Sequence, residues 1–94
     1  MARTVDNLMK MFVSNSESSA RYMAFAEAAD KEGHHGAAKI FGAVATAKMY
    51  HAMSHFRAAG LVDTTGENLK QALEEENYDY KNAYPPMVQD AVKD

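Results

Sequence analysis

The sequence predicts an all-α chain, and two observations lead to that fold class. Apolar residues recur at alternating spacings of three and four, which is the period of one helix face. Four of the five glycines cluster in two breaks, at Gly33/Gly36 and Gly60/Gly66, where helices are expected to end. No stretch shows the alternation that is typical of a strand. We therefore expect one domain over residues 1–94, with three helices at about residues 4–31, 35–59 and 65–84.

The first predicted helix has one apolar face with a polar gap in its middle. Asn15 and Ser19 fill that gap, and "KEGHHG" ends the helix. Because both gap residues fall in phase with the apolar stripe, we expect them to face the interior. The apolar positions are Val5, Leu8, Phe12, Tyr22, Ala26 and Ala29.

The second predicted helix contains the stretch "ATAKMYHAMSHF", in which Lys48, His51 and His55 lie three and four residues apart. Residues at these spacings share one face of a helix. Two histidines alone are a weak zinc signal, because a third ligand from another helix is required. Gly60 is placed to close the helix with a left-handed cap. The full stripe is Ala37, Phe41, Val44, Lys48, His51, His55 and Ala58.

The third predicted helix begins with a capping box formed by Thr64 and Glu67. "YPP" at residues 84–86 is expected to kink or end the helix, because proline removes a helix hydrogen bond and clashes with the preceding turn. A short final turn, "MVQDAVKD", follows. The stripe of this helix is Leu69, Ala72, Glu76, Asp79 and Ala83.

Composition excludes several classes of site. The chain has no cysteine and a net charge of −3, which excludes disulfides, thiolate metal sites and a catalytic thiol and argues against a nucleic-acid partner. No apolar run approaches the roughly 20 residues that span a bilayer, so we expect no membrane partner and a cytoplasmic location. Residues 1–60 carry seven Lys/Arg and five Asp/Glu, whereas residues 61–94 carry three and eight. We expect the acidic third to pack against the rest with electrostatic help. The seven methionines are expected to fill irregular gaps in the core.

Each apolar stripe is interrupted by polar residues at the same depth, which indicates a shared buried polar site. The interruptions are Asn15 in the first helix, Lys48 and His51 in the second, and Glu76 and Asp79 in the third. A faint repeat supports this alignment, because "NLMKMFVSN" and "NLKQALEEE" are offset by 61 residues, which carries Asn15 onto Glu76. Buried charges persist when they are paired or bound to a metal.

The stretches "NLMKMF", "ARYMAFAEAADKEG", "AAKIFGAVATAKMYHA" and "TGENLKQALEEENYDYKNAYP" resemble rubrerythrin, within the ferritin-like diiron-carboxylate proteins. The resemblance covers most of residues 7–86. It implies a four-helix bundle that holds two irons, each half supplying a Glu from one helix and a Glu-x-x-His from the next. It also implies reduction of hydrogen peroxide, with electrons delivered by a rubredoxin-like module.

Carried over by residue, the resemblance implies a damaged metal site. The first-helix Glu falls on Asn15, and the Glu of the first Glu-x-x-His falls on Lys48, while its His is retained as His51. The third-helix Glu is retained as Glu76, and Asp79 stands where the family often has a second carboxylate. We expect the chain to lack the fourth helix, since it stops where the turn into that helix would begin. We likewise expect no rubredoxin-like module, since there is no cysteine.

Three interpretations of Lys48 stay open from the sequence. Its ammonium can replace the metal charge and pair with Glu76. Alternatively, His51, Glu76 and Asp79 can bind a metal in a site that another chain completes. In the third interpretation Lys48 extends to solvent and the histidines are merely packed.

We therefore expect a rubrerythrin-like protein that has lost the diiron site and has a structural or binding role, with no catalytic residue and no cofactor. The alternative is an iron-dependent peroxide reductase, or a metal-binding protein, with its site assembled between chains and iron as the cofactor. Three amphipathic helices cannot seal a four-helix core, so we expect oligomerisation to complete the bundle as a homodimer or higher homo-oligomer.

Overall fold

A computed structural model describes residues 2–94, and no strand occurs within that range. The all-α prediction is therefore confirmed. The chain divides into two compact units, residues 1–61 and 62–94, and each is described by itself. None of the helices within residues 2–94 is long and apolar enough to cross a membrane. The elements are α1 (Ala2–Lys31), α2 (His35–Ala58), α3 (Thr65–Tyr78), the π-helical segment η1 (Asp79–Ala83) and α4 (Tyr84–Lys93).

Glycine ends both helices of the first unit, as the sequence predicts. Gly33 and Gly60 have φ of 85° and 78°, a left-handed conformation that glycine adopts without the penalty of a Cβ atom. The His34 N–H donates to the Ala29 carbonyl and the Gly33 N–H to the Asp30 carbonyl, which is the Schellman arrangement. The same pair of hydrogen bonds recurs around Gly60. These caps fix where α1 ends and where α2 ends.

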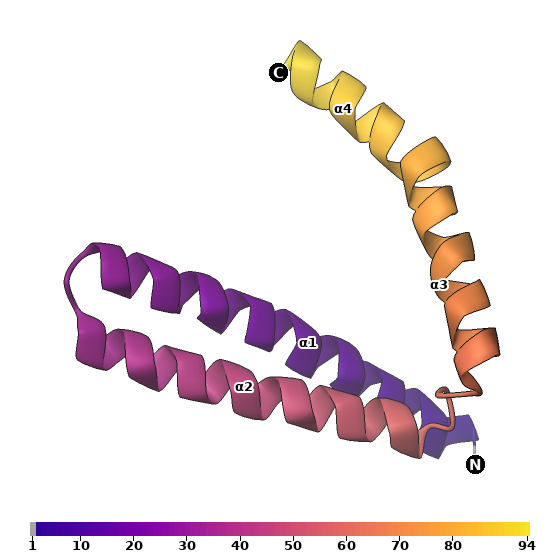
Figure 1. Cartoon of the computed structure of the whole chain (residues 1–94), viewed down its shortest axis with the longest axis horizontal. Helices are drawn as coiled ribbons and strands as arrows, with labels where there is room; N and C mark the ends of the chain where they lie inside the picture. The colour runs from indigo at the N-terminus through magenta and orange to yellow at the C-terminus, as the bar shows by residue number, and fades with distance from the viewer. Residues whose placement is uncertain (1) are drawn as a thin grey trace. The chain divides into compact units, whose positions relative to one another are not determined.

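Helices α1 and α2 form an antiparallel hairpin (Figure 1). Its contact surface is built from small residues. Ala38, Ala45 and Ala52 of α2 are buried at intervals of seven residues. Short side chains allow the two backbones to approach closely. The Ser19 hydroxyl of α1 consequently donates to the Ala45 carbonyl oxygen across the contact, at 2.8 Å. We call the line of Ala38, Ala45 and Ala52 the alanine seam.

Aromatic side chains flank the seam toward both ends of the hairpin. Phe12 and Phe56 have ring centroids 4.8 Å apart. Phe41 lies 5.5 Å from Phe25 and 6.4 Å from Tyr22. Aromatic pairs at these separations contribute about 0.5–1.5 kcal/mol beyond the area that they bury. The aromatic contacts therefore join α1 to α2 on both sides of Ser19.

The predicted face of α1 is the observed one, but the predicted face of α2 is rotated. Asn15, Ser19 and Ala29 are buried in α1, in agreement with the predicted stripe. In α2, Val44 and His51 of the predicted stripe are exposed, and the alanine seam faces α1 instead. The predicted stripe follows the larger residues of α2, whereas close packing of two helices favours the smallest side chains.

The second unit begins with a cap that the sequence predicts in part. The Thr64 hydroxyl oxygen accepts a hydrogen bond from the Glu67 N–H at 3.3 Å, which is one half of a capping box. The returning half is missing, because the Thr64 N–H donates to Asp63 Oδ1 at 2.7 Å and not to Glu67. The Asn68 side chain accepts from the Asp63 N–H and donates to the Asp63 carbonyl, both at 3.0 Å. The cap therefore satisfies backbone groups that the first turn of a helix leaves free.

The prolines change the helix type without ending the helical path. Pro85 and Pro86 occupy the first positions of α4, where a missing N–H costs least. Before them, the Tyr84 N–H donates to the Asp79 carbonyl, five residues back. This π-helical turn widens the helix where proline rings would clash with carbonyls one turn earlier. The third helix therefore ends as an α-helix at Tyr78, not at residue 84, and the expected final turn is the ten-residue helix α4.

Candidate functional site

Three of the positions that the sequence predicts for the site lie on the hairpin, namely Asn15, Lys48 and His51. We call them the remnant face. The hydrogen bond between Ser19 and Ala45 shows that these two residues lie at the same level along the hairpin axis. Asn15 lies one turn before Ser19 on α1, and Lys48 lies about one turn after Ala45 on α2. Because the helices are antiparallel, these steps bring Asn15 and Lys48 to the same level and to the same side of the seam.

Asn15 is buried, with 4% of its surface exposed. Its side-chain Nδ2 donates to the Met11 carbonyl at 2.8 Å, four residues back along α1. Among the described residues, no buried side-chain nitrogen or oxygen lacks a hydrogen-bond partner. The buried amide is therefore satisfied by its own helix.

Lys48 and His55 are half-buried, whereas His51 is exposed. Within the described part of the chain, the one ion pair joins His35 to Asp30 at 3.0 Å near the tip of the hairpin. The hairpin therefore supplies no carboxylate partner for Lys48. A half-buried ammonium needs a countercharge or contact with water.

Glu76 and Asp79, the remaining predicted ligands, belong to the second unit. Glu76 is an exposed residue of α3, and Asp79 is the half-buried first residue of η1. Because the two units are described separately, the pairing of Lys48 with Glu76 stays a prediction. The metal site of His51, Glu76 and Asp79 stays a prediction for the same reason.

The residues of the remnant face do not fit a diiron site. Such a site takes carboxylates from both helices of the pair, and the positions that the resemblance assigns to two of them hold an amide and an ammonium. A protonated amine has no lone pair to donate, so Lys48 cannot bind a metal, and Asn15 offers a neutral amide oxygen in place of a carboxylate. No three His, Asp or Glu side chains within residues 2–94 gather closely enough to hold a metal ion. We therefore derive no step of iron chemistry from this face.

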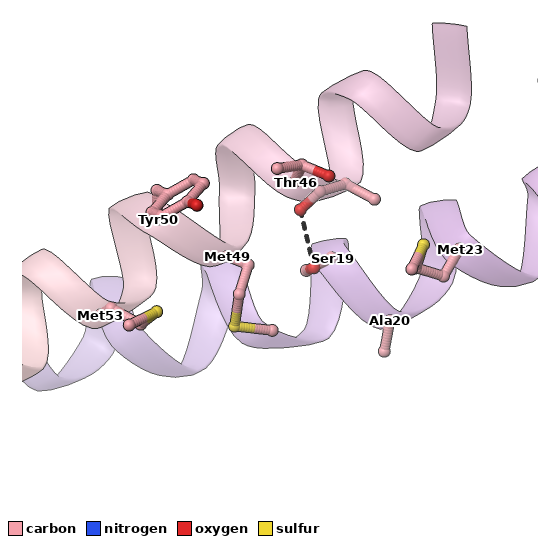
Figure 2. Close-up of a pocket in the computed structure, with 8 residues that line it drawn as sticks. Ser19, Ala20, Met23, Thr46, Met49, Tyr50 and Met53 are labelled. Carbon is pink, nitrogen blue, oxygen red and sulfur yellow. Dashed lines mark hydrogen bonds between the residues drawn. The ribbon is translucent and has the colours of Figure 1, made fainter. Parts of the chain in front are cut away.

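A second feature of the hairpin is an apolar hollow on the opposite side of the seam (Figure 2). We call it the methionine hollow. Residues that follow a seam alanine by three positions, such as Lys48, fall on one side of the seam. Residues that follow by four, such as Met49, fall on the other. Both helices line the hollow, with Ser19, Ala20 and Met23 from α1 and Ala45, Thr46, Met49, Tyr50 and Met53 from α2.

Sequence reasoning missed the methionine hollow. It placed the methionines in the core, yet Met23, Met49 and Met53 are all exposed in this structure. A signal for the hollow was present in the seven-residue repeat of alanines on α2. That repeat identifies the buried seam, and residues 49 and 53, four positions apart, fall together beside it.

Comparison with known proteins supports the resemblance seen in the sequence. No family model matches the chain. The chain is 28% identical over 106 aligned positions to a protein named rubrerythrin from Porphyromonas gingivalis (strain ATCC BAA-308 / W83). The match covers 99% of this chain and 53% of that protein, so the chain spans about half the length of the relative. The chain is thus distantly related to rubrerythrin.

Proposed function

We propose that this chain is a rubrerythrin-like helical protein that has lost the diiron site and has a structural or binding role. The proposal rests on the position and burial of Lys48. A half-buried cation stands on the hairpin at the position that corresponds to a metal-binding Glu, beside a buried Asn15 that bonds its own helix.

Electrostatics supports loss of the metal. Two ferrous ions bring four positive charges, which carboxylates of the family site neutralise. A fixed ammonium within about 4 Å of such ions is strongly repelled in a poorly solvated interior. Lys48 can instead supply the countercharge for one remaining carboxylate, such as Glu76, without any metal.

Iron loading tests the proposal. Protein prepared in iron-supplemented medium should contain no stoichiometric iron by elemental analysis and should not consume hydrogen peroxide above buffer. The matched comparison is the double variant Asn15→Glu with Lys48→Glu, which restores two carboxylates. We expect that variant to gain thermal stability when ferrous or zinc ion is added, whereas the parent gains none. About two irons per bundle in the parent would contradict the proposal.

The alternative is a metal-binding protein or peroxide reductase whose site is assembled between chains. The exposure of His51 and Glu76 favours it, because both side chains are open to another copy. In that case iron would be held by His51, Glu76 and Asp79. Zinc or ferrous ion should then increase the sedimentation coefficient of the parent, and His51→Ala should abolish the increase.

Self-association is part of the proposal, as a homodimer or higher homo-oligomer in the cytoplasm. Its support is the small core. The buried apolar residues of the described chain are all alanines, and no large side chain is fully buried. A domain of this size rarely reaches stability from so little burial without a partner.

A further inference from the structure

Two methionines of the methionine hollow, Met49 and Met53, lie next to each other on α2. They are four residues apart within the α-helix His35–Ala58, so their Cβ atoms are about 5–6 Å apart. Figure 2 shows both side chains on the same side of α2, where they line the hollow. Because this spacing follows from the geometry of one helix, it stays the same whichever surface covers the hollow.

Two thioether sulfurs at this spacing can reach a single metal ion. Each sulfur lies two bonds beyond its Cβ atom on a flexible side chain. The sulfurs can therefore converge to the separation of about 4–5 Å that two metal–sulfur bonds of about 2.3 Å span. A neutral thioether is a soft ligand, which suits Cu(I), whereas carboxylate and carbonyl oxygens suit Mg²⁺ and Ca²⁺.

The surroundings of the two sulfurs favour an ion of single charge. None of the eight residues that line the hollow is Lys, Arg, Asp or Glu, so no charged side chain there repels a cation or offers it a hard anionic ligand. The cost of bringing an ion into apolar surroundings rises with the square of its charge. The Lys48 ammonium, which opposes a metal on the remnant face, lies on the other side of the alanine seam.

The hydroxyls of the hollow are already engaged with the backbone. The Thr46 hydroxyl donates to the Gly42 carbonyl at 3.0 Å, and the Ser19 hydroxyl donates to the Ala45 carbonyl at 2.8 Å. These bonds hold both groups against their helices. The thioether sulfurs are the softest donors that line the hollow.

We propose that Met49 and Met53 form a binding site for Cu(I), in which each residue supplies one thioether sulfur as a ligand. Cu(I) accepts two or three soft ligands, so the pair is sufficient and a third position stays open to water or to a side chain that covers the hollow. Binding forms two metal–sulfur bonds and transfers no electron. The site is separate from the remnant face and does not rest on the loss of iron.

The third methionine of the hollow is too far away to be a ligand. Met23 lies one turn after Ser19 on α1, and Met49 lies one turn after Ala45 on α2. Because the helices are antiparallel, these steps separate Met23 and Met49 by two turns, or roughly 11 Å along the hairpin. Figure 2 accordingly shows Ser19 and Ala20 between Met23 and the methionines of α2. Met23 is therefore a matched control for the site.

Methyl NMR of the full chain, with ¹³C-labelled methionine methyl groups, tests the assignment beside the sulfur atoms. Cu(I) is added under nitrogen in the presence of ascorbate. We expect one equivalent to shift the methyl signals of Met49 and Met53. The signals of Met23 and of Met11, which is 47% exposed and outside the hollow, should not move. Ag(I), a soft ion that is stable in air, should reproduce the shifts, whereas Zn²⁺ should not.

Three leucine variants measure what each sulfur contributes. Leu is close to Met in volume, and circular dichroism checks that each variant folds. Competition with a coloured Cu(I) chelator gives the affinity. Met49→Leu and Met53→Leu should each weaken binding at least about tenfold, since even the loss of an outer-shell partner has an effect of that size. Met23→Leu removes a thioether that is 54% exposed in the same hollow and should leave the affinity unchanged.

Several results would overturn the site. Equal shifts of all the methionine methyl signals would mean that Cu(I) meets thioethers without selecting a pair. A loss of affinity in Met23→Leu as large as that in Met53→Leu would mean the same. Shifts confined to the ring signals of His51 and His55 would place the ion elsewhere, and no methyl shift with about 100 μM Cu(I) would mean that no site exists. Iron content is measured separately, so each of these results leaves the proposed function standing.

Discussion

The hairpin and the C-terminal unit are both helical along nearly all of their length, but their helices are stabilised differently. The described part of the hairpin buries six residues, three in the alanine seam and three in α1, whereas α3, η1 and α4 bury none. Tertiary packing therefore supports α1 and α2. The C-terminal helices depend on local devices, namely the Thr64 cap, the Asn68 hydrogen bonds and the π-helical turn before Pro85.

Caps and turns alone rarely stabilise helices as short as those of the C-terminal unit. Helices shorter than about 12–15 residues are marginal in water, and α3 and α4 have 14 and 10 residues. Residues 62–94 also carry a net charge of −5, against +2 for residues 1–61. The difference predicts that packing on another surface stabilises the C-terminal unit, and the opposite net charges of the two units favour a basic surface.

The largest expected effect is at Lys48, and it tests whether the two units are coupled by charge. If Lys48 pairs with Glu76 away from water, Lys48→Met should lower the free energy of unfolding by about 3–5 kcal/mol, because the carboxylate is left uncompensated. Adding Glu76→Gln should recover much of that loss. Thermal melts of the full chain measure both. The control is Lys39→Met, which removes an exposed lysine from α2. Equal melting of Lys48→Met and Lys39→Met would show that Lys48 is no buried charge partner.

A smaller effect is expected at the alanine seam, and it sharpens the contrast between packed and unpacked helices. Ala52 is 0% exposed, so Ala52→Leu forces the hairpin apart and should cost about 1–3 kcal/mol. Ala47→Leu is the matched control, because Ala47 is an exposed residue of the same helix. Urea unfolding followed by circular dichroism compares the two. If both variants unfold at the same midpoint, the seam is not the contact that holds the hairpin.

The smallest effect is expected at the start of α3, where the substitution removes only the N-terminal cap of one helix. Thr64→Ala removes the oxygen that accepts from the Glu67 N–H and should cost about 1 kcal/mol. Thr65→Ala, one residue later, removes a hydroxyl that caps nothing and should leave the melting temperature within error. Circular dichroism of the full chain measures the change. A loss as large with Thr65→Ala would mean that the cap does not stabilise the unit.

The sequence by itself determined the helical class, the ends of α1 and α2, and the face of α1. Glycine at a left-handed position and the spacing of large apolar residues are local properties, so they can be read without knowing what a helix touches. The sequence also places a change of helix at the prolines, but it does not predict the π-helical turn. The π-helical turn that precedes Pro85 depends on how the whole backbone redistributes its hydrogen bonds.

Only the tertiary structure decided which face of α2 meets α1. Two helices approach most closely where their side chains are smallest, and that choice compares both surfaces at once. It placed the alanines inside, left Met49 and Met53 beside an open hollow, and kept Lys48 half-buried on the other side. Packing also closes off Asn15, whose inward position the sequence predicts, and the Met11 carbonyl of the same helix satisfies its amide.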